Sequence, residues 1–273
     1  MGVCSTSSTA GAGFNNLIMN IKVLGAHNCE TQSTKFACLL IDDILAIDAA
    51  GLTSSLSLPA QLKLKAILLT HQHYDHIRDI PALGMNLFLH YATINIYSTK
   101  VVYDALTSHL LNDKLYPNFL KQPEHDPTIK FTLVEPCQTQ QIEGYDILPT
   151  KSNHPTLTVG YQVTSPGGKT VFYTGDTGSD LDCWKYVSPQ LLITEVTASD
   201  RYKEFAREKG HLTPTLLKQE LITFQELKGY LPEVVLVHMS PNIEEEIAAE
   251  IAAVAKALNS QITLAYEGRQ LNL

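Results

Sequence analysis

Paired cysteines and long apolar runs are both absent from this 273-residue sequence. It has five cysteines, an odd number, and none of them sits at CxxC spacing, which argues against a disulfide framework and against a cysteine-ligated metal. No apolar stretch approaches the length of a transmembrane helix, and the N-terminus lacks the basic start and apolar centre of a secretion signal. We therefore expect a cytoplasmic protein that does not contact a membrane.

Positive charge is also in short supply. Lys and Arg number 20 against 28 Asp and Glu, so the formal net charge is -8. Stable binding to a nucleic-acid backbone needs a surplus of Lys and Arg, and we expect no such binding. A small phosphate substrate is still compatible with this charge, because bound divalent cations supply strong local positive charge.

The chain is long enough for one large domain with a sizeable core, and it shows no internal repeat. Residues 1–18 are rich in small and polar side chains, so we predict a disordered tail there and a single domain over residues 19–273. The first six residues match an N-myristoylation pattern, with Cys4 as a palmitoyl candidate. Because short patterns often match by chance, we prefer a tail, an upstream alternative start or a cloning remnant.

Apolar periodicity predicts many strands, with helices entering later along the chain. The expected strands are 20–24, 36–41, 44–48, 65–70, 86–90, 94–98, 129–135, 145–150, 158–164, 170–173, 191–195, 234–237 and 262–265. The expected helices are 54–64, one that starts at 79–83, 101–111, 213–227 and 243–258. Residues 112–127 carry three prolines and predict a loop or a lid. This order favours an α+β fold, an αββα sandwich of two mixed sheets flanked by helices, over an alternating Rossmann pattern.

Four metal-binding side chains crowd the segment that follows the apolar run at 65–70. They are His71, His73, Asp75 and His76. Imidazoles and carboxylates are the ligands of zinc, iron and manganese. His71 and His73 can point the same way from an extended segment, while Asp75 and His76 follow once the chain turns. Two ligand sets from one turn predict two metal ions side by side.

Further candidate ligands lie beyond this motif, each directly after an expected strand. They are His154, Asp176 and His238, and a fourth residue, His211, stands just before an expected helix. Taken singly, each could be an ordinary turn or surface residue. Their shared position at strand ends favours a common site. The remaining histidines lie in no comparable setting: His27, His90, His109 and His125.

This order of residues resembles the metallo-β-lactamase superfamily over nearly the whole chain from Met19, with Asp48 ahead of the HxHxDH motif. The resemblance implies an αββα sandwich with two divalent ions, zinc first and manganese or iron as alternatives. One ion would be held by His71, His73 and His154. The other would be held by Asp75, His76 and His238. Asp176 would bridge the two ions, and Asp48 would orient the ligand loop.

Three segments narrow the resemblance to the phosphodiesterase branch, which includes ribonuclease Z and the class II cyclic-nucleotide phosphodiesterases. They are Glu195–Thr197, Gly210–Pro214 and His238–Pro241. In that branch a histidine ahead of a helix contacts the scissile phosphate or protonates the leaving oxygen, a role that falls to His211 here. We predict His211 and Asp75 as the catalytic residues. The sequence around His211 looks closer to that of the cyclic-nucleotide enzymes. The segment Ile77–Pro81, however, differs from the glycine-containing stretch that is usual in both families.

We therefore predict a metal-dependent hydrolase, a phosphodiesterase that acts on a small phosphodiester or nucleotide. The alternatives are a ribonuclease Z-like endonuclease, a thioester or lactam hydrolase of the same superfamily, and a non-catalytic ligand-binding scaffold. Since related phosphodiesterases are often dimers, a homodimer is among the expectations. Four aromatic side chains are candidates to line the cleft: Tyr116, Phe119, Trp184 and Tyr202.

Overall fold

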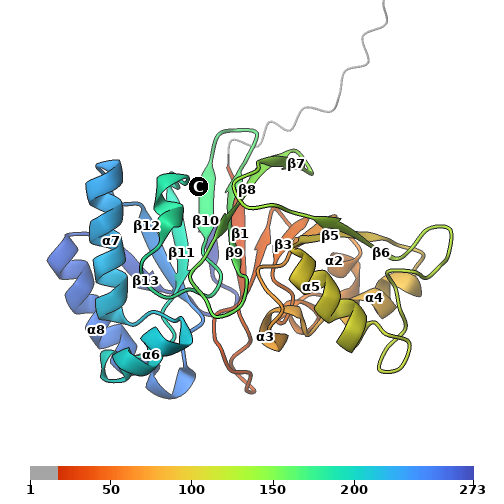
Figure 1. Cartoon of the computed structure of the whole chain (residues 1–273), viewed down its shortest axis with the longest axis horizontal. Helices are drawn as coiled ribbons and strands as arrows, with labels where there is room; N and C mark the ends of the chain where they lie inside the picture. The colour runs from red at the N-terminus through yellow and green to blue at the C-terminus, as the bar shows by residue number, and fades with distance from the viewer. Residues whose placement is uncertain (1–17) are drawn as a thin grey trace, which may run out of the picture.

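Two seven-stranded sheets form the centre of the computed structural model, which describes residues 18–273 (Figure 1). The predicted lipidation pattern and nearly all of the predicted tail lie outside these residues. The first sheet has the order β14-β1-β2-β3-β4-β5-β6. Its strands are β1 (Asn20–Gly25), β2 (Cys38–Ile41), β3 (Leu45–Ile47), β4 (Ala66–Leu68), β5 (Ile94–Ser98), β6 (Ile129–Leu133) and β14 (Gln270–Asn272).

The second sheet has the order β13-β12-β11-β10-β9-β8-β7. Its strands are β7 (Gln140–Ile142), β8 (Tyr145–Lys151), β9 (Val159–Thr164), β10 (Thr170–Tyr173), β11 (Leu191–Glu195), β12 (Glu233–Val237) and β13 (Ile262–Leu264). Each sheet is mixed. Pairing is antiparallel from β14 to β3 and parallel from β3 to β6, while in the second sheet it is parallel from β13 to β10 and antiparallel from β10 to β7.

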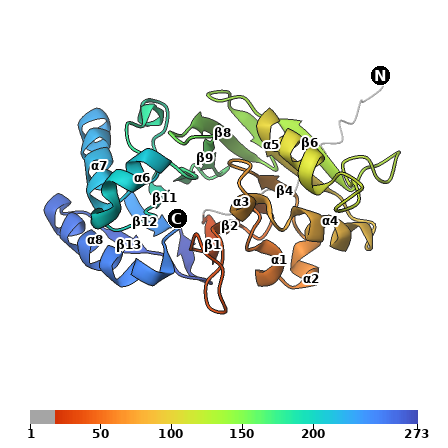
Figure 2. The same ribbon diagram turned by 60° about the horizontal axis from the view of Figure 1, so that its bottom comes forward.

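Helices cover the outer face of each sheet (Figures 1 and 2). On the side of the first sheet lie α1 (Leu52–Ser55), α2 (Leu58–Gln61), α3 (Tyr74–Ile77), α4 (Ile80–Phe88) and α5 (Lys100–Ala105). On the side of the second sheet lie α6 (Lys203–Lys209), α7 (Pro214–Lys228) and α8 (Glu244–Leu258). Within residues 18–273, no helix is both long and apolar enough to cross a membrane. The predicted αββα sandwich and α+β class are confirmed.

The apolar pattern of the strands explains the layers. One buried cluster fills the space between the sheets and continues under α7 and α8, and a second lies between the first sheet and the helices α1 to α5. A central strand such as β11 is buried along its whole length, which is why its sequence is almost continuously apolar. The Asp42–Asp43 turn between β2 and β3 has positive φ at both residues, 46° and 61°, as a tight hairpin with right-handed strand twist requires.

The prediction of a strand at 86–90 is wrong, because α4 continues to Phe88. The sequence there is a short apolar run, Leu87–Leu89, between two polar residues, yet Leu83 and Leu87, four residues apart, are the buried pair, and Leu89 is exposed. Helical spacing therefore overrides the short apolar run. The single helix expected at 54–64 is two short ones, since Pro59 starts α2 as a new helix. Strands β7 and β14 and helix α6 were not predicted.

Strand direction brings the candidate ligands to one edge. Parallel strands end at the same edge of a sheet. In the first sheet β3 and β4 are parallel, and in the second sheet β10, β11 and β12 are parallel. Strand β8 runs in the direction of β10, because both are antiparallel to β9. The chain turns sharply directly after two of these strands, where Asp48 and His238 both have φ of 60°. Such left-handed conformations at non-glycine residues concentrate at functional sites.

Candidate metal centre and active site

Side chains from both sheets meet at this edge in three groups of potential metal ligands. The first group is His71, His73, His154 and Asp176, the second is Asp75, His76, Asp176 and His238, and the third is Glu195, His211 and His238. In each group one ligand atom per residue lies within 4.8 Å of the others. The structure thus brings together all seven residues predicted as ligands, and Asp176 belongs to both the first and the second group. That they bind two ions stays a prediction.

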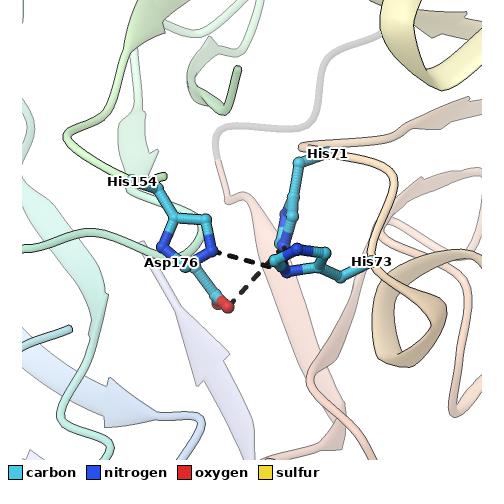
Figure 3. Close-up of side chains that lie close together, drawn as sticks. All are labelled: His71, His73, His154 and Asp176. Carbon is cyan, nitrogen blue, oxygen red and sulfur yellow. Dashed lines mark hydrogen bonds and ion pairs between the residues drawn. The ribbon is translucent and has the colours of Figure 1, made fainter. Parts of the chain in front are cut away.

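The first group surrounds a point between three imidazoles and a carboxylate (Figure 3). His71 Nε2 lies 2.9 Å from His73 Nδ1, and His154 Nε2 lies 3.4 Å from the same atom. His71 Nε2 is also 3.7 Å from Asp176 Oδ2. Nitrogens that face one another at such distances offer several lone pairs to one point.

The second group shares Asp176 with the first. His76 Nε2 is 3.3 Å from Asp176 Oδ1, and His238 Nε2 is 3.5 Å from Asp176 Oδ2. His238 Nε2 also lies 3.3 Å from Asp75 Oδ2. Asp176 therefore lies close to histidines of both groups, as a bridging ligand requires.

Two buried polar atoms show that a cation fits this centre. His76 Nε2 and Asp176 Oδ1 make no hydrogen bond with any of the described residues, although they lie 3.3 Å apart. Leaving such groups unsatisfied in the interior costs about 1–3 kcal/mol each. A cation between them would satisfy both. Nitrogen and carboxylate donors together suit zinc, manganese and iron.

Burial and neighbouring charge set the protonation of the centre. Burial, together with the nearby His76, lowers the pKa of His71 well below its usual range, so His71 is neutral and ready to donate a lone pair. Burial alone would raise the pKa of Asp176, but the charges of His238 and His76 outweigh it and hold that pKa well below the usual value. Both residues are thus in the form that binds a cation.

In four of the histidines Nδ1 makes a hydrogen bond to a neighbouring residue, so Nε2 is the nitrogen that faces the centre. His71 pairs with Thr70 Oγ1 at 3.0 Å and His76 with Asp48 Oδ2 at 2.8 Å. His154 pairs with the Gly210 carbonyl at 2.9 Å and His238 with Thr197 Oγ1 at 2.8 Å. Partners of this kind fix the tautomer and orientation of metal-ligating histidines.

Two buried carboxylates organise these contacts in the same way. Asp48 accepts a hydrogen bond from the Thr70 hydroxyl at 3.0 Å and binds His76 directly. Glu195 accepts one from the Thr197 hydroxyl at 2.5 Å and binds His211 Nδ1 at 2.7 Å. Each hydroxyl gives its single proton to a carboxylate, so its oxygen accepts from the neighbouring ligand histidine.

His211 stands beside the centre without belonging to either predicted ligand set. Its ring stacks on that of His238, with 5.6 Å between centroids and 19° between planes. Burial alone would lower the pKa of His211, but the charge and hydrogen bond of Glu195 outweigh it and raise that pKa to about 9. Because Nδ1 is bound to Glu195, Nε2 is the nitrogen left to meet a substrate.

A pocket of about 560 Å³ opens over His73, His154 and His211. The apolar part of its lining consists of Pro155, Ala198, Tyr202, Phe205 and Ile243. The polar contributions are Asn28, Thr197, Lys209, Ser240 and Asn242. A substrate with a reacting polar group and an apolar or planar remainder matches this lining.

Tyr202 is the one of the four candidate aromatic residues that lines this pocket. Phe119 and Trp184 are buried in the core, and Tyr116 packs against Phe119. The loop at 112–127 does not line this pocket either, since Phe119 lies against α4 and Pro123 lines a separate pocket with Phe88. The expectation that this loop covers the site as a lid finds no support.

Residues 41–239 match the family model for the beta-lactamase superfamily domain. The chain therefore belongs to the metallo-β-lactamase superfamily, a class of metal-dependent hydrolases, as the resemblance of its motifs implied.

Known proteins that are similar to this chain have low sequence identity to it. An octanoyltransferase of Porphyromonas gingivalis is 26% identical over 182 residues, which are 65% of this chain and 32% of that protein, so the chain spans about a third of the relative's length. The metallo-beta-lactamase fold protein YhfI of Bacillus subtilis is 21% identical, with a TM-score of 0.74 and coverage of 94% and 100% of the two chains. Unliganded yeast PDE1 is 17% identical, with a TM-score of 0.79 and coverage of 94% and 99%.

Proposed function

We propose that the protein is a phosphodiesterase that hydrolyses a small phosphodiester or nucleotide. The observation that carries this proposal is the Glu195–His211 pair beside the two ligand groups, with 2.7 Å between Oε1 and Nδ1. Hydrolysis of a phosphodiester expels an alkoxide-like oxygen, which needs a proton as it leaves. An imidazole placed beside the centre, but outside both predicted ligand sets, can supply that proton.

Two divalent ions held by the seven ligands would supply Lewis acidity at the phosphate and lower the pKa of water towards about 7. The residues of the chain do the rest. His211 donates its Nε2 proton to the departing oxygen, and Glu195 keeps the Nδ1 proton in place and stabilises the imidazolium before transfer. A pKa of about 9 leaves His211 protonated at neutral pH, as an acid must be.

The shape and charge of the pocket favour a small substrate over a long nucleic acid. Among the described residues that line the pocket, Lys209 is the only Lys or Arg, and the chain as a whole carries a formal net charge of -8. A long RNA needs many phosphate contacts with Lys and Arg, which argues against a ribonuclease Z-like endonuclease. Tyr202 and Phe205 give the remainder of a small substrate an apolar wall.

Thioester hydrolysis is a second candidate. The apolar wall formed by Tyr202 and Phe205 suits an acyl chain, and the curated relative is an octanoyltransferase. A thiolate, however, is a stable leaving group, because thiols have a pKa of about 8.5. It needs no acid, so this reaction gives His211 no evident task.

A direct assay separates the two candidates. The purified chain, loaded with zinc or manganese, is given cyclic nucleotides, bis-p-nitrophenyl phosphate and octanoyl-coenzyme A, each with and without chelator. We expect chelator-sensitive turnover of the phosphodiesters. Turnover of the thioester alone would replace the first candidate with the second, and no turnover of either class would reject both.

A further inference from the structure

Gly210 lies at the junction of three parts of the site. It ends α6, it precedes His211, and its carbonyl oxygen lies 2.9 Å from His154 Nδ1. Its backbone is left-handed, with φ of 70° and ψ of 45°. A carbonyl that accepts from Nδ1–H leaves the lone pair of the imidazole on Nε2, which faces His73 Nδ1 at 3.4 Å.

The packing at Gly210 is closer than the end of a helix requires. A Cβ atom there would lie 2.5 Å from Pro155 Cδ and 3.2 Å from His154 Nδ1. Gly229 ends α7 in a similar left-handed conformation, with φ of 79°, yet a Cβ atom there would meet none of the described residues within 4 Å. The left-handed backbone therefore serves to end the helix at both glycines, whereas the close approach is particular to Gly210.

His154 depends on this contact more than His71 depends on its own. Thr70 adjoins His71 in the sequence, and both follow the buried strand β4. His154, by contrast, is only partly buried, lies in the irregular segment between β8 and β9, and takes its Nδ1 partner from 56 residues away. Without that partner its ring would be free to turn.

We propose that Gly210 is the positioning residue for His154, and that its closeness to Pro155 is what keeps His154 Nε2 directed at the first metal position. The inference rests on metal binding by the two ligand groups. It places the orientation of one ligand under the control of α6, the same short helix that presents Phe205 and Lys209 to the pocket.

The test compares Gly210→Ala with Gly229→Ala by zinc titration against a chromophoric chelator. Both variants place a side chain in a left-handed conformation, so both lose some thermal stability. Only Gly210→Ala should weaken binding of one of the two zinc ions, by about 10- to 100-fold, the usual effect of losing an outer partner of a ligand histidine. Circular dichroism of the metal-free variants checks that each is folded.

Two further variants probe the packing itself. Adding Pro155→Ala to Gly210→Ala removes the Cδ atom that the new Cβ meets, so part of the lost zinc affinity should return. Gly178→Ala does not need a positive φ and would bring a Cβ to 3.3 Å from Gly210 Cα and from the Asn153 carbonyl oxygen, so it should shift the Gly210 carbonyl only slightly. This milder variant should lose less affinity, and it provides the test if Gly210→Ala does not fold.

Three results would overturn the inference. The first is a folded Gly210→Ala protein that binds both zinc ions with wild-type affinity, or a Gly178→Ala protein that does so if Gly210→Ala does not fold. The second is an equal loss of zinc affinity in Gly229→Ala. The third is a wild-type protein that binds no zinc. If the wild-type protein binds two ions but hydrolyses no phosphodiester, the proposed function fails while the zinc titrations still decide the role of Gly210.

Discussion

Asp48 and Glu195 are fully buried acids at matching places in the two sheets, and each controls two histidines. Asp48 makes a hydrogen bond with His76, and it accepts one from the Thr70 hydroxyl, whose oxygen in turn pairs with His71. Glu195 holds His211 directly and reaches His238 through Thr197, so one carboxylate orients both a ligand and the proposed acid. A buried network of this kind is stable only if every member is satisfied.

Removing one hydroxyl from this network should therefore disturb the metal centre. Thr197→Val keeps the side-chain shape but leaves Glu195 Oε2 without the hydroxyl proton and His238 Nδ1–H without an acceptor. We expect zinc affinity to fall by about 10- to 100-fold. Isothermal titration with zinc measures this change.

Thr223→Val is a matched control for that experiment. Thr223 is exposed on α7, and its hydroxyl donates only to the Gln219 carbonyl. Its zinc affinity should equal that of the wild type. A Thr197→Val protein that binds both ions normally would show that the hydroxyl does not orient His238.

The role of His211 predicts a dependence on the leaving group. His211→Ala should retain both ions and lose about 10²- to 10⁴-fold in turnover of a cyclic nucleotide, whose alcohol must be protonated as it leaves. With bis-p-nitrophenyl phosphate the loss should be much smaller, because nitrophenolate departs without a proton. Steady-state kinetics on both substrates measures the difference.

Metal analysis of the same variant separates the alternatives. If His211→Ala loses an ion, His211 is a ligand and its role as an acid is wrong. An equal loss on both substrates would likewise argue against proton donation. His90→Ala, which changes an exposed histidine just after the end of α4, serves as the control.

The candidate ligands could be picked out in the sequence because their chemistry is local, and that they bind metal stays a prediction. Imidazoles and carboxylates that directly follow apolar strands are costly unless they bind something, and this cost is visible in the order of residues. The contacts of Thr197 and Gly210 could not be predicted, since a threonine and a glycine are common in any loop. Their partners, His238 and His154, are distant in the sequence and become neighbours only once the second sheet has formed.

At the scale of elements, the helices and strands that were not predicted are those that bury few apolar side chains. Helix α6 has one buried residue, Ala206, and β14 has one, Leu271, so neither shows an apolar period. Edge strand β7 likewise buries only Ile142. The long helices α7 and α8 could be predicted because several apolar residues at helical spacing face the second sheet.

Helix α7 also anchors the segment that follows Asp176. Glu220 accepts hydrogen bonds from the backbone N–H of Asp180 at 2.7 Å and from Trp184 Nε1 at 2.8 Å. Glu220→Ala leaves these donors unsatisfied in a buried place, so we expect the free energy of unfolding to fall by about 1–3 kcal/mol. Urea denaturation of the metal-free protein measures it.

Glu226→Ala is the control on the same helix, because Glu226 is exposed. Its stability should stay within about 0.5 kcal/mol of the wild type. If Glu220→Ala is as stable as Glu226→Ala, the anchoring role of Glu220 is wrong.

At the scale of the molecule, His27 joins the two ends of the chain. Its Nδ1 lies 2.7 Å from Glu267 Oε1, close to β14, and its Nε2 lies 3.1 Å from Glu244 Oε2, at the start of α8. Burial alone would lower the pKa of His27, but the hydrogen bonds and charges of Glu267 and Glu244 outweigh it and raise that pKa. His27 therefore binds its proton more tightly in the folded chain than in the unfolded one.

This raised pKa predicts a pH-dependent stability. The stabilisation is fully present below the unfolded pKa of about 6.5 and disappears as the pH rises through the raised folded value. His27→Gln should be less stable than the wild type by about 1.5–3 kcal/mol at pH 6, and the gap should narrow towards pH 9. Urea denaturation of both metal-free proteins across this range measures the gap, and a gap independent of pH would contradict the prediction.

The distribution of the ligands along the chain has a consequence for biosynthesis. The residues that would cage the ions run from His71 to His238, and β14, which pairs with β1, comes later still. A polypeptide emerging from the ribosome can offer an incoming cation only fragments of its final cage. A complete cage for the predicted pair of ions therefore exists only after translation of His238, so each ion would have to reach a chain in which most of this domain has already been made.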